Sequence, residues 1–148
     1  MARNPGAHMG VRGLEERALI ALVHAAAEAA APSDAVVGAG GLSPSQYNVL
    51  RILSRAGEGG LTRTEIAERM VTRDPDMTRL LKGLESKKLV VSWRAEADAR
   101  QRKSRVTDQG TALLRVLNPQ VTRAAKRSLG RLRRERLAEL IDILSDLS

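Results

Sequence analysis

The sequence of 148 residues contains no cysteine and almost no aromatic residues, with one Trp, one Tyr and no Phe. The absence of cysteine excludes disulfides, thiolate nucleophiles and Cys-ligated zinc or iron–sulfur sites. Only His8 and His24 could supply imidazole, so a histidine-rich metal site is excluded as well. With so few aromatic residues, the core must consist of Leu, Ile, Val, Ala and Met. Such a core favours packed helices over a β-rich fold.

Other features are also missing from the sequence. No apolar run approaches the length of about 20 residues that spans a bilayer, and Arg-Asn-Pro-Gly precedes any hydrophobic stretch that could serve as a secretory signal. We therefore expect a cytoplasmic protein with no membrane partner. There is also no Ser/His/Asp set, Gly-rich phosphate loop or cleft-like carboxylate pair. We expect neither an enzyme nor a cofactor.

Positive charge is concentrated after residue 60. The chain holds 25 Lys and Arg residues against 17 Asp and Glu residues, for a formal net charge of +8. Residues 1–60 are balanced, whereas residues 61–105 hold twelve basic and seven acidic side chains and residues 111–148 hold eight and four. This distribution indicates a face that meets a polyanion. An ordinary solvated Arg-rich surface is an equal alternative on charge alone, so the motifs must decide.

The spacing of apolar residues predicts a mainly α-helical chain with a small two-stranded β-hairpin. Helices are predicted over residues 11–31, from residue 43 to the glycines at 57–60, from residue 62, from residue 72 to 88, from residue 108 and over residues 133–147, with strands at 89–93 and 104–106. Pro32 is expected to end the first helix and Pro119 to kink the fifth. Residues 1–10 contain Gly-Ala-His-Met and are typical of an expression-tag remnant.

Capping residues mark the starts of several predicted helices. Ser43 is followed by proline, and Thr62 and Glu65 have the spacing of a capping box. In the helix predicted to open at Thr72, Asp76 falls in the first turn, where a negative charge is favourable. The helix, turn, helix and hairpin then follow in the order of a winged helix–turn–helix. Such a helix fits the DNA major groove, and a basic hairpin tip reaches the adjacent minor groove.

Several segments in this order resemble the MarR family of bacterial transcriptional regulators. They are LSPSQYNVL at 42–50, LTRTEIA at 61–67, VTRDPDMTRLLKGLE at 71–85, Asp98-Ala99-Arg100 and VTDQG at 106–110. The resemblance implies that residues 42–110 form a DNA-binding lobe. It also implies that residues 11–31 and 111–148 form dimerisation helices of one intertwined domain. Pro119 and the alanines of the wing tip depart from the family pattern.

The polar residues of the helix predicted from Thr72 could form an ordinary solvated face, but the preceding helix and the wing favour contacts with DNA. The predicted DNA-binding residues are Thr72, Arg73, Asp76, Thr78, Arg79, Lys82, Arg94, Arg100, Arg102 and Lys103, with Asp98 organising the wing. Arg73 and Asp76 are assigned to base edges, Arg79 and Lys82 to phosphates, and Arg100 to the minor groove. For Asp76, helix capping is an equal alternative.

The resemblance also implies a homodimer and an effector site. The predicted dimer contacts are Leu14, Leu22, Leu137, Leu140, Ile141 and Leu144. The family's effector pocket would lie near His24, Gln46, Tyr47 and Arg51, although packing or surface hydrogen bonding is the favoured interpretation of each. We therefore predict a homodimeric repressor of a pseudo-palindromic operator in double-stranded DNA, with release by a small-molecule ligand as the expected control. The alternative is a winged-helix module that binds protein, or an architectural DNA binder, without an effector.

Overall fold

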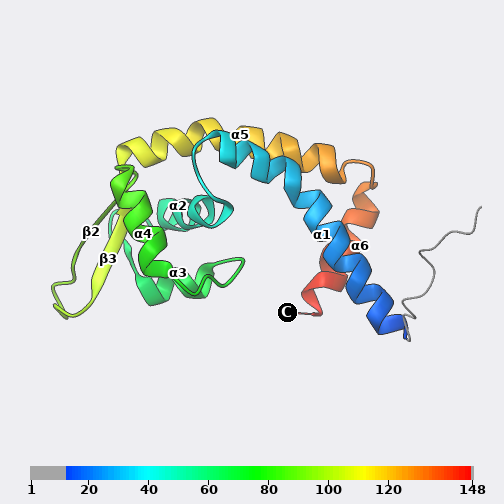
Figure 1. Ribbon diagram of the computed structural model, residues 1–148, viewed down its shortest axis with the longest axis horizontal. Coiled ribbons are helices and arrows are strands. Elements are labelled where there is room, and N and C mark those ends of the chain that lie inside the picture. Colours follow the sequence, from blue (N-terminus) through cyan, green and yellow to red (C-terminus); the bar gives the residue numbers. More distant parts are fainter. Residues whose placement is uncertain (1–12, 148) are drawn as a thin grey trace, which may run out of the picture.

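The computed structural model describes residues 13–147 and has the predicted mainly helical architecture (Figure 1). The elements are α1 (Leu14–Ala39), α2 (Pro44–Ala56), β1 (Leu61–Thr62), α3 (Arg63–Arg69), α4 (Met77–Ser86), β2 (Val90–Arg94), β3 (Arg102–Val106), α5 (Asp108–Leu129) and α6 (Arg134–Ser145). The predicted tag remnant at 1–10 and the predicted helix start at Val11 lie outside the described residues.

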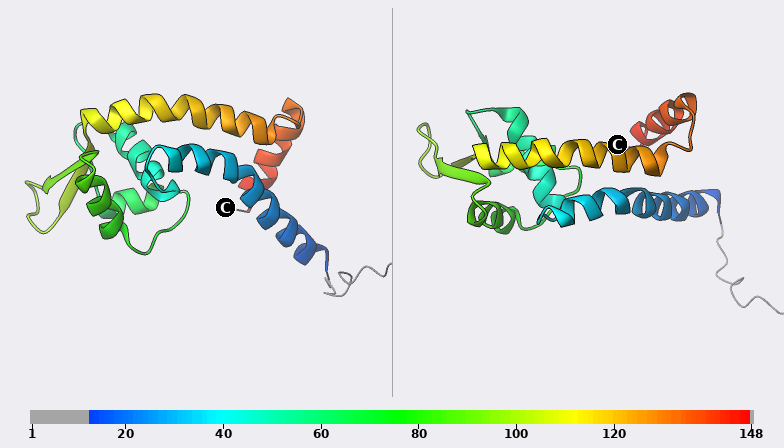
Figure 2. Two further views of the ribbon diagram at one scale, coloured as in Figure 1. Left: turned by 45° about the horizontal axis from the view of Figure 1, so that its top comes forward. Right: turned by 90° about the horizontal axis from the view of Figure 1, so that it is seen from above.

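The elements form a compact lobe at one end and an extended helical arm at the other. The lobe consists of α2, α3, α4 and the three strands, whereas α1 and α5 run away from it side by side (Figure 1, Figure 2). At the far end of this arm the chain turns into α6. The winged helix–turn–helix and the terminal helices are thus arranged as the fold class requires.

The hydrophobic core lies mainly in the lobe and is largely aliphatic, as the composition predicted, although Tyr47 also belongs to it. Leu50 and Leu53 of α2 are fully buried together with Ile66 of α3 and Leu84 of α4. Leu114 and Leu117 of α5 belong to the same cluster of buried residues. Because burial of each such side chain stabilises a fold by about 1.5–3 kcal/mol, this cluster fixes the positions of the lobe helices.

The strands form a three-stranded antiparallel sheet in the order β1-β3-β2. The predicted hairpin is confirmed, with Val90 opposite Val106 and Ser92 opposite Ser104. The third strand, β1, was not predicted because two residues are too short to show an alternating pattern. Its Leu61 lies opposite Ser104, so β1 ties the start of α3 to the wing.

The predicted caps are present, but Pro32 does not end the first helix as predicted. Ser43 accepts from the backbone N–H of Gln46 at 3.1 Å and Thr62 accepts from that of Glu65 at 3.3 Å. In contrast, α1 continues through Pro32 to Ala39, and α5 passes through Pro119 to Leu129. A proline inside a helix costs about 3 kcal/mol. The mutual packing of α1 and α5 offsets that cost, which the local sequence could not show.

The helix α1 has an unusually exposed apolar surface. By length and composition alone α1 could cross a membrane, contrary to the expectation that no segment of the chain is apolar enough. In its most apolar stretch of 18 residues, 6% of the residues are buried. One such helix is weak evidence for insertion, and α1 lies alongside α5. Leu14, Leu19 and Val23 of α1 are between 60% and 75% exposed. This face therefore lacks a partner within the described residues.

Lys88 occupies a backbone conformation that favours glycine. Its φ is +60°, just after the C-terminal end of α4, and an L-residue in this region costs about 1–2 kcal/mol. We expect Lys88→Gly to raise the free energy of unfolding by about 1 kcal/mol in urea denaturation, after the entropic cost of glycine. Lys87→Gly is the control. Lys87 has a φ of −83°, and its Nζ donates to the Gly41 carbonyl, so this change should lower stability. A less stable Lys88→Gly variant would contradict the strain argument.

Candidate nucleic-acid interface

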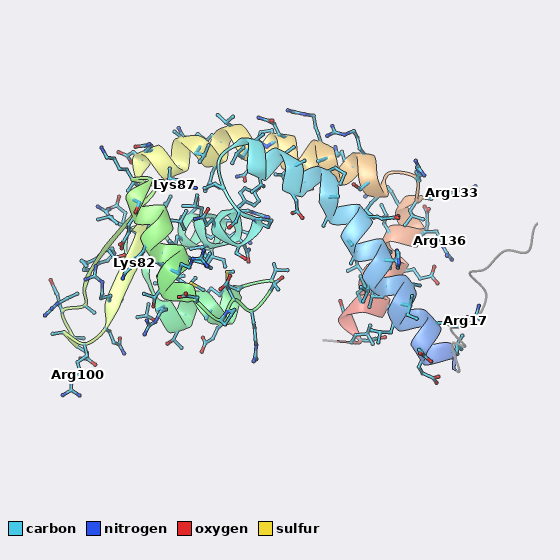
Figure 3. The ribbon with its side chains drawn as sticks, in the orientation of Figure 1. Arg17, Lys82, Lys87, Arg100, Arg133 and Arg136 are labelled. Carbon is cyan, nitrogen blue, oxygen red and sulfur yellow. The ribbon has the colours of Figure 1, made fainter. Side chains whose placement is uncertain are left out.

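A hollow of about 810 Å³ opens between the start of α3, α4 and the wing. Basic, hydroxyl and acidic side chains line it, namely Arg63, Lys82, Arg100 and Arg102, then Thr62, Thr64, Thr78, Ser92 and Ser104, then Glu65 and Glu85. Arg100 extends from the tip of the hairpin and Lys82 projects from α4 on the same end of the molecule (Figure 3). Converging cations and hydroxyls suit the phosphates and base edges of a nucleic acid.

The helix predicted from Thr72 to Lys88 is shorter than predicted. It begins at Met77, not at Thr72, so Thr72 and Arg73 lie in the segment between α3 and α4. The prediction was wrong because Asp74 precedes a proline, which disfavours helical backbone, and its Oδ1 accepts from the Asp76 backbone N–H at 2.9 Å.

Asp76 caps α4. Its Oδ1 accepts from the backbone N–H of Arg79 at 3.0 Å, which satisfies a donor that the helix start would otherwise leave unpaired. Of the two interpretations that the sequence left open, capping is therefore the one observed in the structure. The segment between α3 and α4 is also anchored to α2, because Asn48 Oδ1 accepts from the Val71 N–H at 3.0 Å.

The two faces of α4 differ sharply. Met77, Leu81 and Leu84 are buried, with the spacing of one helix face. The predicted DNA contacts Thr78, Arg79 and Lys82 are all exposed. Sequence reasoning missed a hydrogen bond between α3 and α4, in which Arg63 donates from Nη1 to Thr78 Oγ1 at 2.6 Å. The two residues are 15 positions apart, so no helical spacing could have revealed the pair.

The wing presents the other predicted basic residues. Arg94 and Arg102 lie opposite each other at the ends of β2 and β3, and Lys103 pairs with Trp93. Between the strands, Asp98 Oδ1 accepts from the backbone N–H of Arg100 at 3.0 Å. The Asp98 carboxylate thus shapes the turn that carries Arg100.

A carboxylate is held in its charged form beside this surface. The backbone N–H and the hydroxyl of Thr62 donate to Glu65 Oε2 at 2.7 and 3.0 Å. These bonds lower the pKa of Glu65, helped by the nearby charges of Lys103 and Arg69. The capping interaction is therefore complete at neutral pH and is lost as the pH falls through this lowered pKa.

The four residues predicted near an effector pocket do not form one cluster. Tyr47 Oη donates to Asn118 Oδ1 at 2.8 Å, and the Arg51 guanidinium lies 5.7 Å from the centre of the Tyr47 ring. Burial raises the pKa of Tyr47, against the opposing charge of Arg51. Gln46 is engaged in the cap of α2, where its Oε1 accepts from the Ser43 N–H, and His24 is exposed on α1. None of the four lines the hollow beside α4.

The residues predicted for a dimer interface lie at or near the surface of the helical arm. Leu14 and Ile141 are 75% and 63% exposed. The other four, Leu22, Leu137, Leu140 and Leu144, are half-buried. The whole of α6 contains no buried residue. The arm therefore carries an apolar surface that the described part of this chain does not cover.

Comparisons with known proteins relate these features to one group. The sequence pattern that defines the MarR family matches residues 40–101. Among solved structures, the MarR transcription factor from Planctomyces limnophilus is 32% identical, with 92% of this chain and 98% of that chain covered and a TM-score of 0.71. No curated protein matches the sequence.

Two further solved structures share the fold at lower identity. A probable transcriptional regulator from Pseudomonas aeruginosa is 18% identical and covers 92% of this chain and 100% of its own, with a TM-score of 0.80. BpsR from Bordetella bronchiseptica, whose DNA binding is regulated by 6-hydroxynicotinic acid, is also 18% identical. The match covers 88% of this chain and 98% of the BpsR chain, with a TM-score of 0.78.

The two interpretations of Asp76 lead to different mutant behaviour. We expect Asp76→Ala to lower the free energy of unfolding by about 1 kcal/mol, because a helix N–H loses its acceptor. Asp76→Asn should be nearly neutral in the same urea titration, since Asn caps a helix equally well. Its base preference in duplex selection should also stay unchanged. A new preferred base pair in Asp76→Asn would show instead that the carboxylate contacts a base.

Proposed function

The chain belongs to the MarR family of transcriptional regulators, and on this premise we propose that it is a cytoplasmic, homodimeric repressor that binds a pseudo-palindromic operator and is released by a small-molecule ligand. The observation that carries the proposal is the convergence of the exposed face of α4 with the basic wing around one hollow. Neither element alone would distinguish a DNA-binding surface from a solvated helix or loop.

In the proposed complex, α4 enters the major groove and the wing follows the backbone into the minor groove. Thr78 and Arg79 occupy the first turn of α4, where Arg79 keeps its predicted assignment to a phosphate. Arg73, in the segment before α4, keeps its predicted assignment to a base edge. Lys82 lies one turn further along and faces phosphate. Arg100 enters the minor groove, where the narrow walls concentrate negative potential. Each neutralised phosphate releases counterions, so affinity should fall steeply with salt.

The dimer is proposed from the uncovered apolar surface of the helical arm. Ile141, Ile143 and Leu147 in and after α6 are each more than half exposed, as are Leu14 and Leu19 of α1. An apolar surface that extends over two helices marks an interaction site in a soluble protein. A second copy would cover it and set two recognition helices about one turn of DNA apart, roughly 34 Å.

Ligand control is proposed to act through the contacts that join the arm to the lobe. Tyr47 of α2 is bonded to Asn118 of α5. Lys87, at the end of α4, donates to the carbonyl of Gly41 beyond the end of α1. A ligand that shifts α1 or α5 would therefore shift α4. Because the two α4 helices must match the DNA repeat, a small shift would suffice, and a coupling of about 1–3 kcal/mol changes affinity about 5–150-fold.

Selection of bound duplexes from a random pool tests the function. We expect an inverted repeat with half-sites about one helical turn apart. Arg100→Ala should weaken binding to all duplexes and lower the slope of log affinity against log salt by about 1. Arg133→Ala is the matched control, since Arg133 lies at the far end of the molecule from the wing (Figure 3). A wild-type protein that binds selected and random duplexes equally would support the architectural alternative.

The dimer has its own test. We expect Ile141→Glu to give a monomer in analytical ultracentrifugation, because the charge would be buried against the second copy. Operator affinity should fall by about 100-fold, since the two half-sites then bind independently. Val91→Glu is the control for the oligomeric state alone, since Val91 is 41% exposed on β2, outside the helical arm but within the proposed DNA-binding wing. A monomeric Ile141→Glu protein with wild-type operator affinity would refute the proposed dependence on dimerisation.

A further inference from the structure

Arg63 is the first residue of α3, yet its side chain is hydrogen-bonded to α4, the proposed recognition helix. The bond from Nη1 to Thr78 Oγ1 is 2.6 Å long and joins α3 to the first turn of α4. Both side chains are exposed. Arg63 takes part in no ion pair within residues 13–147. The guanidinium is therefore held in place by a neutral partner and keeps its full charge for a ligand.

The bond to Thr78 leaves most of the guanidinium available. An arginine side chain has five N–H donors in a planar fork, and one of them is used here. The free donors can form the bidentate contact with O6 and N7 of guanine that is the commonest specific contact to DNA. An arginine fixed by a second side chain loses less conformational freedom on binding than a mobile one. The pair is thus suited to directional recognition.

The orientation of Arg63 favours a base edge over a phosphate. Glu65 and Glu85 line the same hollow as Arg63, as do the cations Lys82, Arg100 and Arg102, so local charge does not separate the two targets. The bond to Thr78 does, because it fixes the direction of the planar guanidinium, and a fixed guanidinium matches the two acceptors of a guanine edge. Phosphates are better served by Lys82 and by the wing.

We infer that Arg63, oriented by Thr78, contacts a guanine in the major groove of each half-site and determines the base preference there. The inference rests on the proposed function and adds a residue from α3 to the reading surface. Thr78 acts in this account as a positioning residue. The assignment of base contacts thereby moves from Asp76, which is engaged as a cap, to a pair that spans both helices of the motif.

The experiment compares base preferences of the dimeric protein and its variants, starting from the duplex that the wild type selects. We expect Arg63→Lys to keep affinity for random duplex within about threefold, because the charge remains. Its preference for guanine at one position of each half-site should fall by about tenfold or more, because the fork is lost. Thr78→Val should weaken the preference at the same position. The double variant Arg63→Ala, Thr78→Val should lose no more than Arg63→Ala alone.

Arg69→Ala is the matched control. Arg69 is also an exposed arginine of α3, but its Nη1 donates to the Glu65 carbonyl of its own helix at 2.6 Å. Its removal should leave every base preference unchanged. Urea denaturation of each variant checks that the fold is intact.

The possible failures are distinguishable. If the wild type selects no sequence, both the proposed function and this inference are wrong. If the wild type selects an inverted repeat and Arg63→Lys retains all its preferences, only the inference is wrong, and Arg63 binds phosphate. A loss of preference in Arg69→Ala equal to that in Arg63→Lys would also overturn the assignment.

Discussion

The interface depends on the burial of one face of α4. Met77, Leu81 and Leu84 pack in the same buried cluster as Leu50 and Leu53 of α2. This packing fixes the orientation of α4 about its own axis. The polar face that remains outside is then presented in a single orientation. Caps complete the restraint, because Asp76 closes the start of α4 and Thr62 closes the start of α3. The proposed DNA-binding surface needs this rigidity, since misplaced donors lose directional hydrogen bonds.

The same core also connects the lobe with the rest of the chain. Leu114 and Leu117 of α5 belong to it, so the arm is an extension of the lobe's packing. Polar contacts supplement this connection at two points, Tyr47 with Asn118 and Lys87 with Gly41. The arm is thus packed against the lobe where the two meet, and it exposes apolar side chains farther away. The exposed apolar surface of the arm is the feature on which the proposed homodimer rests.

Local signals predicted most of the elements. The capping residues Ser43 and Thr62 marked two helix starts, and the apolar spacing identified the buried residues of α4 even though its start was misplaced. The misplaced start has a local cause as well. Asp74 and Asp76 suit a helical first turn by charge, but the proline between them and the turn closed by the Asp74 side chain keep the backbone out of the helix until Met77. Competition between two local preferences could not be decided from residue types.

The sequence by itself determined the aliphatic core, the order of the helices, the basic hairpin and the resemblance to a family, because these depend on composition and on contacts between near neighbours. Only the tertiary structure decided what depends on distant neighbours. It carried α1 through Pro32 by packing it on α5, added β1 to the sheet, and brought Arg63 against Thr78. The physical reason is the same in each case. Burial and hydrogen bonds between remote segments outweigh local preferences of a few kcal/mol, and no spacing rule records which remote segments will meet.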